Sequence, residues 1–166
     1  MLRLNLLRHA KSSWQAPDLD DHERDLNERG QRDAPCMGRA LATRMEAQPV
    51  YCSSALRARR TLEGLVEGWP QLAQQAQVVD EALYTFDWEE LLDWVQAFDG
   101  GSHSCFIIGH NPALTNLCNQ LVGRPALDNL PTAGYLAFEL PVERWSDVTE
   151  GIGSLEDWLF PRDLLA

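Results

Sequence analysis

Short apolar segments alternate with segments of helical periodicity along most of this 166-residue chain. The segment at 104–110, Ser-Cys-Phe-Ile-Ile-Gly-His, is a continuous apolar run, as expected of a strand in the middle of a parallel sheet. Strands are predicted at residues 3–9, 49–54, 76–84, 104–110 and 134–141, with an added edge strand at 143–150.

Helices are predicted where apolar residues recur at intervals of three and four, at residues 31–47, 55–69, 87–98 and 111–123. Pro35 fits the first of these only near its first turn, because proline removes a helical hydrogen bond farther in. For the helix at 111–123, Asn111 is the predicted N-cap, Pro112 lies in the first turn and Gly123 lies beyond the end.

The alternation of strands and helices predicts an α/β fold, a three-layer α/β/α sandwich with a mostly parallel central sheet. Residues 15–30 are acidic and rich in turn-forming residues, which predicts a long loop of the kind that carries function. Length and the lack of a linker favour one domain over residues 1–166. In such folds, ligands bind beyond the carboxyl ends of the parallel strands.

The net charge of −11 argues against a broad surface for nucleic acid or for an anionic membrane. The first residues do not resemble a signal peptide, and no apolar run is long enough to span a bilayer. The four cysteines are widely spaced and show no metal-binding pattern, so we expect reduced thiols in a cytoplasmic protein. An acidic chain can still form a small phosphate pocket from a few local arginines.

Several polar residues follow directly on the predicted strands. His9 ends the first strand, and His110 ends the strand at 104–110. Ser53 and Ser54 end the second strand, and Arg57 falls in the first turn of the helix that follows it. Because parallel strands end at the same edge of a sheet, we expect these side chains to lie close together.

Arg8 and Arg57 have the chemistry of a phosphate site. A guanidinium presents a rigid fork of donors that matches phosphate oxygens, and it stays charged at any working pH. Arg8 lies at the end of an apolar strand, where an unpaired charge would be costly. A metal site at His9 and His110 is not favoured, because neither has an Asp, Glu or Cys at ligand spacing. We therefore expect no metal and no cofactor.

Two imidazoles and two guanidiniums around one phosphate suggest phosphoryl transfer. Neutral imidazole is a competent nucleophile near neutral pH, and its attack on phosphorus gives a phosphohistidine that water can hydrolyse. The arginines would hold the phosphoryl oxygens and stabilise the charge of the transition state. The second histidine, if protonated, would donate a further hydrogen bond.

Three segments of the chain resemble the signatures of the histidine phosphatase superfamily: Leu-Leu-Arg-His-Ala-Lys-Ser-Ser-Trp at 6–14, Ser-Ser-Ala-Leu-Arg-Ala-Arg-Arg-Thr at 53–61, and Gly-His-Asn-Pro at 109–112. Ala10 stands where the first family motif has glycine. The first segment and the one at 21–38 are more specifically similar to phosphohistidine phosphatases of the SixA type. The resemblance extends over nearly the whole chain, and it implies the family's α/β/α fold.

The resemblance implies that His9 is the phosphorylated nucleophile and that Arg8, Arg57 and His110 complete the phosphate pocket. Larger relatives carry an acidic residue after the third strand, which protonates an alkoxide leaving group. The nearest candidate for this general acid is Glu81, with Asp80 and Asp87 less favoured.

The possible classes of substrate differ in how much help their leaving groups need. An alkoxide needs a proton from an acid, whereas imidazole, with a pKa of about 6.5, departs with little help. The favoured interpretation is a metal-independent phosphatase for phosphohistidine on proteins, such as a histidine phosphotransfer domain. The alternatives are a phosphatase of small phosphate esters with Glu81 as acid, and a phosphate-binding module without catalysis.

Overall fold

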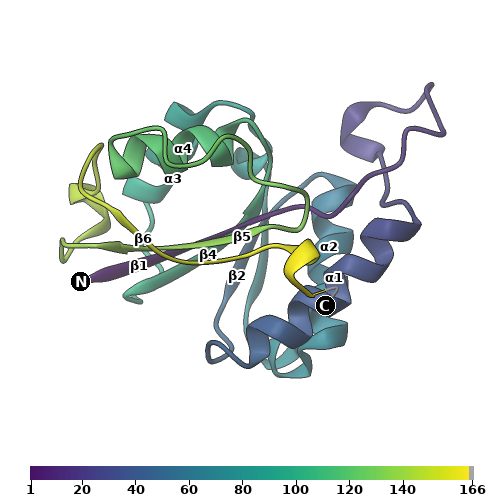
Figure 1. The fold of residues 1–166 in the computed structure, drawn as a ribbon, viewed down its shortest axis with the longest axis horizontal. Helices are drawn as coiled ribbons and strands as arrows, with labels where there is room; N and C mark the ends of the chain where they lie inside the picture. Colours follow the sequence, from purple (N-terminus) through teal and green to yellow (C-terminus); the bar gives the residue numbers. More distant parts are fainter. Residues whose placement is uncertain (165–166) are drawn as a thin grey trace.

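The computed structural model describes residues 1–164, and its centre is a mixed six-stranded sheet (Figure 1). The strands are β1 (Leu2–Arg8), β2 (Val50–Ser53), β3 (Gln77–Asp80), β4 (Ser104–Gly109), β5 (Tyr135–Leu140) and β6 (Ser154–Leu159). Their order across the sheet is β3-β2-β4-β1-β5-β6. The strands from β3 to β1 pair in parallel, and β5 and β6 pair antiparallel. The predicted mostly parallel α/β sheet is confirmed.

Two pairs of helices cover the two faces of this sheet (Figure 1). The helices are α1 (Glu28–Ala42), α2 (Leu56–Gly68), α3 (Trp88–Gln96) and α4 (Ala113–Val122). The helices α3 and α4 pack on one face, and α1 and α2 pack on the other. The result is the predicted three-layer sandwich.

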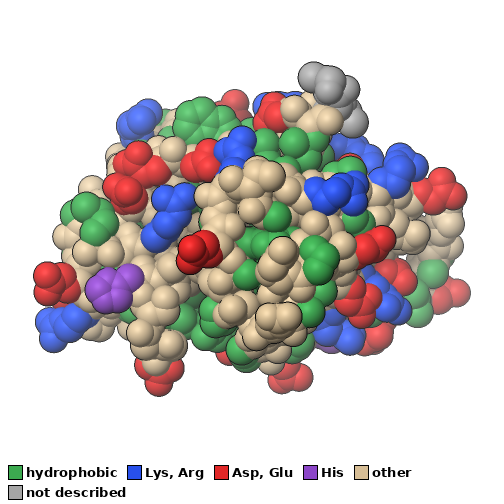
Figure 2. Space-filling view, turned by 90° about the horizontal axis from the view of Figure 1, so that it is seen from below, with side chains coloured by type: hydrophobic (Ala, Val, Ile, Leu, Met, Phe, Trp, Pro, Cys, Tyr) green, Lys and Arg blue, Asp and Glu red, His purple; other side chains and the backbone are tan. Residues whose placement is uncertain are grey.

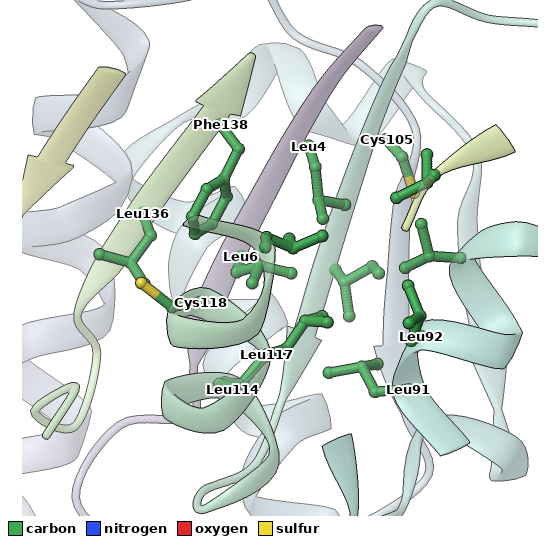
Figure 3. Packing of buried hydrophobic residues seen from close by; sticks show 14 of the residues in the cluster. Leu4, Leu6, Leu91, Leu92, Cys105, Leu114, Leu117, Cys118, Leu136 and Phe138 are labelled. Carbon is green, nitrogen blue, oxygen red and sulfur yellow. The ribbon is translucent and has the colours of Figure 1, made fainter. Parts of the chain in front are cut away.

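The alternation of side chains along β1 supplies both layers of the core. Leu4 and Leu6 point toward the layer of α3 and α4 and belong to the same buried cluster as Leu114 and Leu117 (Figure 3). Leu7 belongs to the opposite cluster, beneath α1 and α2. Full burial of each such side chain stabilises the fold by about 1.5–3 kcal/mol, so this central strand is held from both sides.

The edge of the sheet differs from the sequence prediction. Residues 143–150 do not form a strand; a short 3-10 helix (Trp145–Asp147) lies there, and the edge strand is β6. Trp145 is buried in the core beside α3, and its indole N–H donates to the Ser102 carbonyl oxygen at 3.0 Å. Burial of this one large side chain outweighs the strand-like pattern of its neighbours.

Helix α1 begins earlier than predicted and contains Pro35 in its interior. The Asn27 side chain caps the helix by accepting the Gly30 N–H at 2.9 Å, so the helix starts at Glu28 rather than at residue 31. The long loop that precedes it therefore ends at the cap. This loop leaves β1 at the carboxyl end of the parallel strands (Figure 1).

The surface carries charges of both signs. On the face shown in Figure 2, acidic and basic side chains are interspersed and do not form one continuous basic area. Within residues 1–164, no helix combines the length and the apolar character needed to cross a membrane.

Glycines allow α1 and α2 to approach each other at backbone distance. A Cβ added at Gly38 would lie 2.5 Å from the carbonyl oxygen of Leu65, and one at Gly68 would overlap the carbonyl oxygen of Pro35. Because α2 carries Arg57 in its first turn, this contact also determines where that guanidinium lies.

The variant Gly38→Ala should separate the two helices and destabilise the protein by about 1–3 kcal/mol, because the added methyl group meets rigid backbone. Urea unfolding measures the change. Arg32→Ala on the exposed side of α1 is the matched control and should leave the midpoint unchanged. An unchanged midpoint for Gly38→Ala would show that the helices can adjust without cost.

Candidate active site

The two histidines that follow central strands lie next to each other. His9 comes directly after β1 and His110 directly after β4, and these strands pair in parallel with Arg8 opposite Gly109. The ring centroids of the two histidines are 5.2 Å apart. Both side chains are almost fully buried. The structure thus brings together the two imidazoles that the sequence placed at one rim.

The hydrogen bonds of His9 determine which ring nitrogen carries the proton. Its Nδ1 lies 2.7 Å from the carbonyl oxygen of Ala10. A carbonyl oxygen can only accept, so Nδ1 is the protonated nitrogen and Nε2 keeps its lone pair. The Nε–H of Arg57 points to this Nε2 at 3.4 Å. The free lone pair of His9 therefore faces a guanidinium.

Ser53 is the hydrogen-bond partner of His110. The Ser53 hydroxyl oxygen lies 2.7 Å from His110 Nε2 and accepts the N–H of Ala55 at 3.2 Å. The hydroxyl hydrogen of Ser53 can be donated to Nε2. In that arrangement the ring hydrogen of a neutral His110 is on Nδ1, a buried atom without a hydrogen-bond partner in the described chain. An uncharged His110 can then donate from Nδ1.

Burial holds both imidazoles in their neutral form. The pKa of His9 is lowered to about 3, mainly by burial and further by the nearby charges of Arg57 and Arg8. The pKa of His110 is lowered to about 2, again mainly by burial, with His9 and Arg57 adding to the effect. At neutral pH both rings are uncharged, which is the state a nucleophilic imidazole requires.

The two predicted arginines also converge on this site. Arg57 is 2% exposed, and its two terminal nitrogens donate to the backbone oxygen of Asp21 at 2.6 Å and to its carboxylate at 2.9 Å. Arg8 donates from one terminal nitrogen to the carbonyl oxygen of Leu130 at 2.8 Å. The buried Nε of Arg8 has no partner among the described residues, which leaves a charged donor for a bound anion.

A third arginine, Arg24, comes from the loop between β1 and α1. It donates to the Asp21 carboxylate at 2.9 Å, to the Ser12 hydroxyl and to the Ser13 carbonyl oxygen. Its guanidinium carbon lies 3.4 Å above the ring of Trp14, a cation–π contact. Trp14 is 71% exposed, so it covers Arg24 at the mouth of the site and does not pack in the core.

These side chains surround a pocket of about 260 Å³. The residues that line it are Arg8, His9, Lys11, Ser12, Trp14, Asp21, Arg24, Arg57, Phe86, Asn111 and Thr132. His110 lies behind this surface, with its ring 5.5 Å from that of Phe86. The pocket combines four cationic side chains with one carboxylate, which suits a small, multiply charged anion.

The candidate general acids lie elsewhere. Glu81 is exposed in the 3-10 helix after β3 and is not among the residues that line the pocket. Asp80 accepts hydrogen bonds from the backbone N–H of Ala82 and from the indole of Trp94. Asp87 caps α3.

Asp21 and Arg24 are among the pocket residues that were not singled out from the sequence. Both belong to the stretch at 15–30 that was predicted to be a functional loop. The available signal was the Asp-His-Glu-Arg tetrapeptide from Asp21 to Arg24, whose opposite charges ion-pair within one turn, at 2.9 Å. Without a periodic pattern, the direction of their side chains could not be predicted.

Comparisons with known proteins identify a protein family and related proteins. The family model of the histidine phosphatase superfamily (branch 1) matches residues 4–96. An uncharacterized protein of Mycobacterium leprae is 34% identical over 122 residues, which cover 70% of this chain and 71% of that protein.

Solved structures share the fold over almost the full chain. The candidate phosphohistidine phosphatase SixA of Agrobacterium tumefaciens is 26% identical with a TM-score of 0.78, covering 96% of this chain and 98% of that one. The protein histidine phosphatase SixA complexed with tungstate is 23% identical with a TM-score of 0.77, covering 98% and 99%. A mycobacterial glucosyl-3-phosphoglycerate phosphatase has a TM-score of 0.67 at 15% identity, covering 95% and 99%.

The buried histidines should make the protein less stable in mild acid. Their folded pKa values lie below the value of about 6.5 in an unfolded chain, so the unfolded state binds protons first as the pH falls. Stability is fully present above that pH and is lost below it, by up to about 1.4 kcal/mol per pH unit for each ring. Urea unfolding at pH 7.5 and pH 5 measures the loss.

The variant His9→Asn should reduce this pH dependence, because one titrating ring is removed. His103→Asn, at an exposed position, is the control and should behave as wild type. Equal stability of the wild-type protein at the two pH values would contradict the lowered pKa values.

Proposed function

We propose, on the premise that this chain belongs to the histidine phosphatase superfamily, that it hydrolyses phosphohistidine on proteins through a covalent intermediate at His9. Membership of this family makes the chain a phosphatase. The substrate and the chemical steps are our proposal, and so is a cytoplasmic location. The observation that carries it is a neutral His9 whose Nε2 lone pair faces the guanidinium of Arg57 in an anion pocket.

In the first step, Nε2 of His9 attacks the phosphorus atom. The bond between phosphorus and the substrate imidazole breaks as the bond to Nε2 forms. The substrate histidine, protonated on its other ring nitrogen, takes the electron pair of the broken bond and leaves as a neutral imidazole. The hydrogen bond from Nδ1 to Ala10 holds the ring in the reactive tautomer during attack. Nδ1 keeps its proton throughout, so the phosphorylated His9 carries a positive charge next to the phosphoryl group.

Arg8, Arg57 and His110 would stabilise the phosphoryl group during its transfer. Arg57 offers its Nε–H beside the attacking nitrogen, and Arg8 offers an Nε–H that has no other partner among residues 1–164. His110 adds the donor on Nδ1. These donors are in place before the reaction, so little reorganisation is needed when the transition state forms.

In the second step, water attacks phosphorus and His9 departs with its lone pair restored. The products are inorganic phosphate and the free enzyme, ready for another cycle. The residues of the pocket supply the positive charge that many phosphatases draw from metal ions. We propose that the reaction needs no metal.

The position of the carboxylates favours imidazole as the leaving group. Asp21 is the one carboxylate among the described residues that line the pocket, and its pKa is held below the usual value. It is ionised at neutral pH and has no proton to give to an alkoxide. An imidazole leaving group, with a pKa of about 6.5, does not require that proton.

A phosphatase of small phosphate esters is the second candidate, with Glu81 as its acid. The fold shared with a glucosyl-3-phosphoglycerate phosphatase favours it, as does the small volume of the pocket. This candidate requires Glu81 to reach the pocket when substrate binds.

Substrate preference separates the two candidates. A phosphohistidine protein, such as a histidine phosphotransfer domain, should turn over about a hundredfold faster than a phosphoserine protein, since a general acid contributes at least that factor to ester hydrolysis. Release of phosphate measures both rates. Faster turnover of phosphoserine, with loss of that activity in Glu81→Gln, would favour the ester phosphatase.

The covalent intermediate can be trapped with a radiolabelled phosphohistidine protein and an alkaline denaturing quench, which preserves the bond between phosphorus and nitrogen. Label should appear on His9 of the wild-type enzyme and be absent from His9→Asn, and activity should survive treatment with a chelator. His103→Asn should label normally. A protein that binds phosphate without labelling or turnover would instead be a binding module.

A further inference from the structure

The carboxylate of Asp21 makes several hydrogen bonds, although none of the chemical steps proposed above uses this group. It lies in the 3-10 helix Asp21–Glu23 of the loop after β1. One oxygen accepts the hydroxyl of Tyr84 at 2.6 Å and a terminal nitrogen of Arg57 at 2.9 Å. The other accepts Arg24 at 2.9 Å. The backbone oxygen of the same residue accepts the second terminal nitrogen of Arg57 at 2.6 Å.

These contacts occupy one edge of the Arg57 guanidinium and leave another edge free. Asp21 takes one hydrogen from each of the two terminal nitrogens. The Nε–H lies on a different edge of the planar guanidinium and points toward His9 Nε2. That edge is the one a phosphoryl group on His9 would meet, so Asp21 does not occupy the phosphate position but turns the free edge toward it.

The charge of Asp21 has a second effect. Burial alone would raise its pKa, but hydrogen bonds from Tyr84 and Arg57 and the charges of Arg57 and Arg24 outweigh burial and keep the pKa low. The carboxylate is therefore negative at neutral pH while it lines the pocket. It repels a phosphate dianion in the same pocket, and this repulsion weakens the binding of substrate and product.

We propose that Asp21, held in place by Tyr84, is a positioning residue that orients Arg57 for the transition state and lowers the affinity of the pocket for free phosphate. The inference rests on the proposed phosphatase function. Orientation acts on the reacting phosphoryl group, whereas repulsion acts on bound substrate and on product. A single carboxylate would thus raise kcat by both routes, by aligning the donor and by aiding phosphate release.

The test uses Asp21→Asn, which keeps the size of the side chain and removes its charge. The kcat for a phosphohistidine protein should fall by about tenfold to a hundredfold, as expected when a catalytic donor is misaligned. The dissociation constant of inorganic phosphate, measured by titration calorimetry, should fall, because the repulsion by the carboxylate is removed. A lower kcat together with tighter phosphate binding is the signature of a positioning role, because general damage to the pocket would weaken phosphate binding as well.

Tyr84→Phe provides a milder second variant, because it removes one hydroxyl and leaves every charge. It should also lower kcat, by a smaller factor than Asp21→Asn does. Asp20→Asn is the matched control, an exposed neighbouring carboxylate whose side chain makes no hydrogen bond among those the structure describes. It should match the wild-type enzyme in kcat and in phosphate binding.

Two results would overturn the inference: an unchanged kcat in Asp21→Asn, or phosphate binding that is unchanged or weaker when kcat falls. Failure of the proposed function looks different. If the wild-type protein turned over no phosphorylated substrate, the phosphate titration would still report the effect of Asp21 on the pocket, with tighter binding in Asp21→Asn expected from the loss of repulsion alone.

Discussion

The dominant constraint on this molecule is the concentration of positive charge at the carboxyl ends of its parallel strands. Three guanidiniums and two imidazoles meet there, partly or fully shielded from water. If all five were charged, the repulsion and the loss of hydration would destabilise the fold severely. Guanidiniums cannot lose their protons at ordinary pH, so the imidazoles remain neutral. The same burial that stabilises the fold thereby gives His9 a lone pair.

Positive charge that cannot be removed needs a counter-charge, and the loop after β1 supplies it. Asp21 contacts both Arg57 and Arg24, and Trp14 stacks over Arg24 at the surface. The arginines are thus fixed before any anion arrives. Preorganised donors of this kind stabilise a transition state without paying for their alignment during the reaction. The contacts that stabilise the arginines in the fold therefore also hold them in position to bind an anion.

The convergence of the residues at the strand ends could be predicted from the sequence, for a physical reason. His9 and His110 each follow an apolar strand, Arg8 ends one, and Arg57 begins a helix after another. Parallel pairing brings such positions to one edge whatever the details of packing. The same logic located the central strands and the four helices. It failed at the edge of the sheet, where residues 143–150 contain a 3-10 helix with the buried Trp145 and the edge strand β6 is the partly exposed segment that follows.

The loop residues could not be predicted in this way. Asp21 and Arg24 reach the pocket through ion pairs and a cation–π contact, which depend on tertiary structure and leave no periodic trace. Glu81, suggested by the family pattern, lies on the exposed surface after β3. Strand ends are therefore the predictable component of such a site, and loop contacts are the component that requires a structure.

The lining of the pocket comes from separate parts of the chain. Part of its lining, including Ser12, Trp14, Asp21 and Arg24, comes from a single contiguous peptide, whereas His9, Arg8 and Arg57 come from the end of β1 and from α2. If the proposed function holds, substrate selectivity and chemistry are encoded in separate stretches of the gene. Variation confined to that peptide would then change which phosphorylated molecules are accepted and leave the scaffold and the proposed reaction intact.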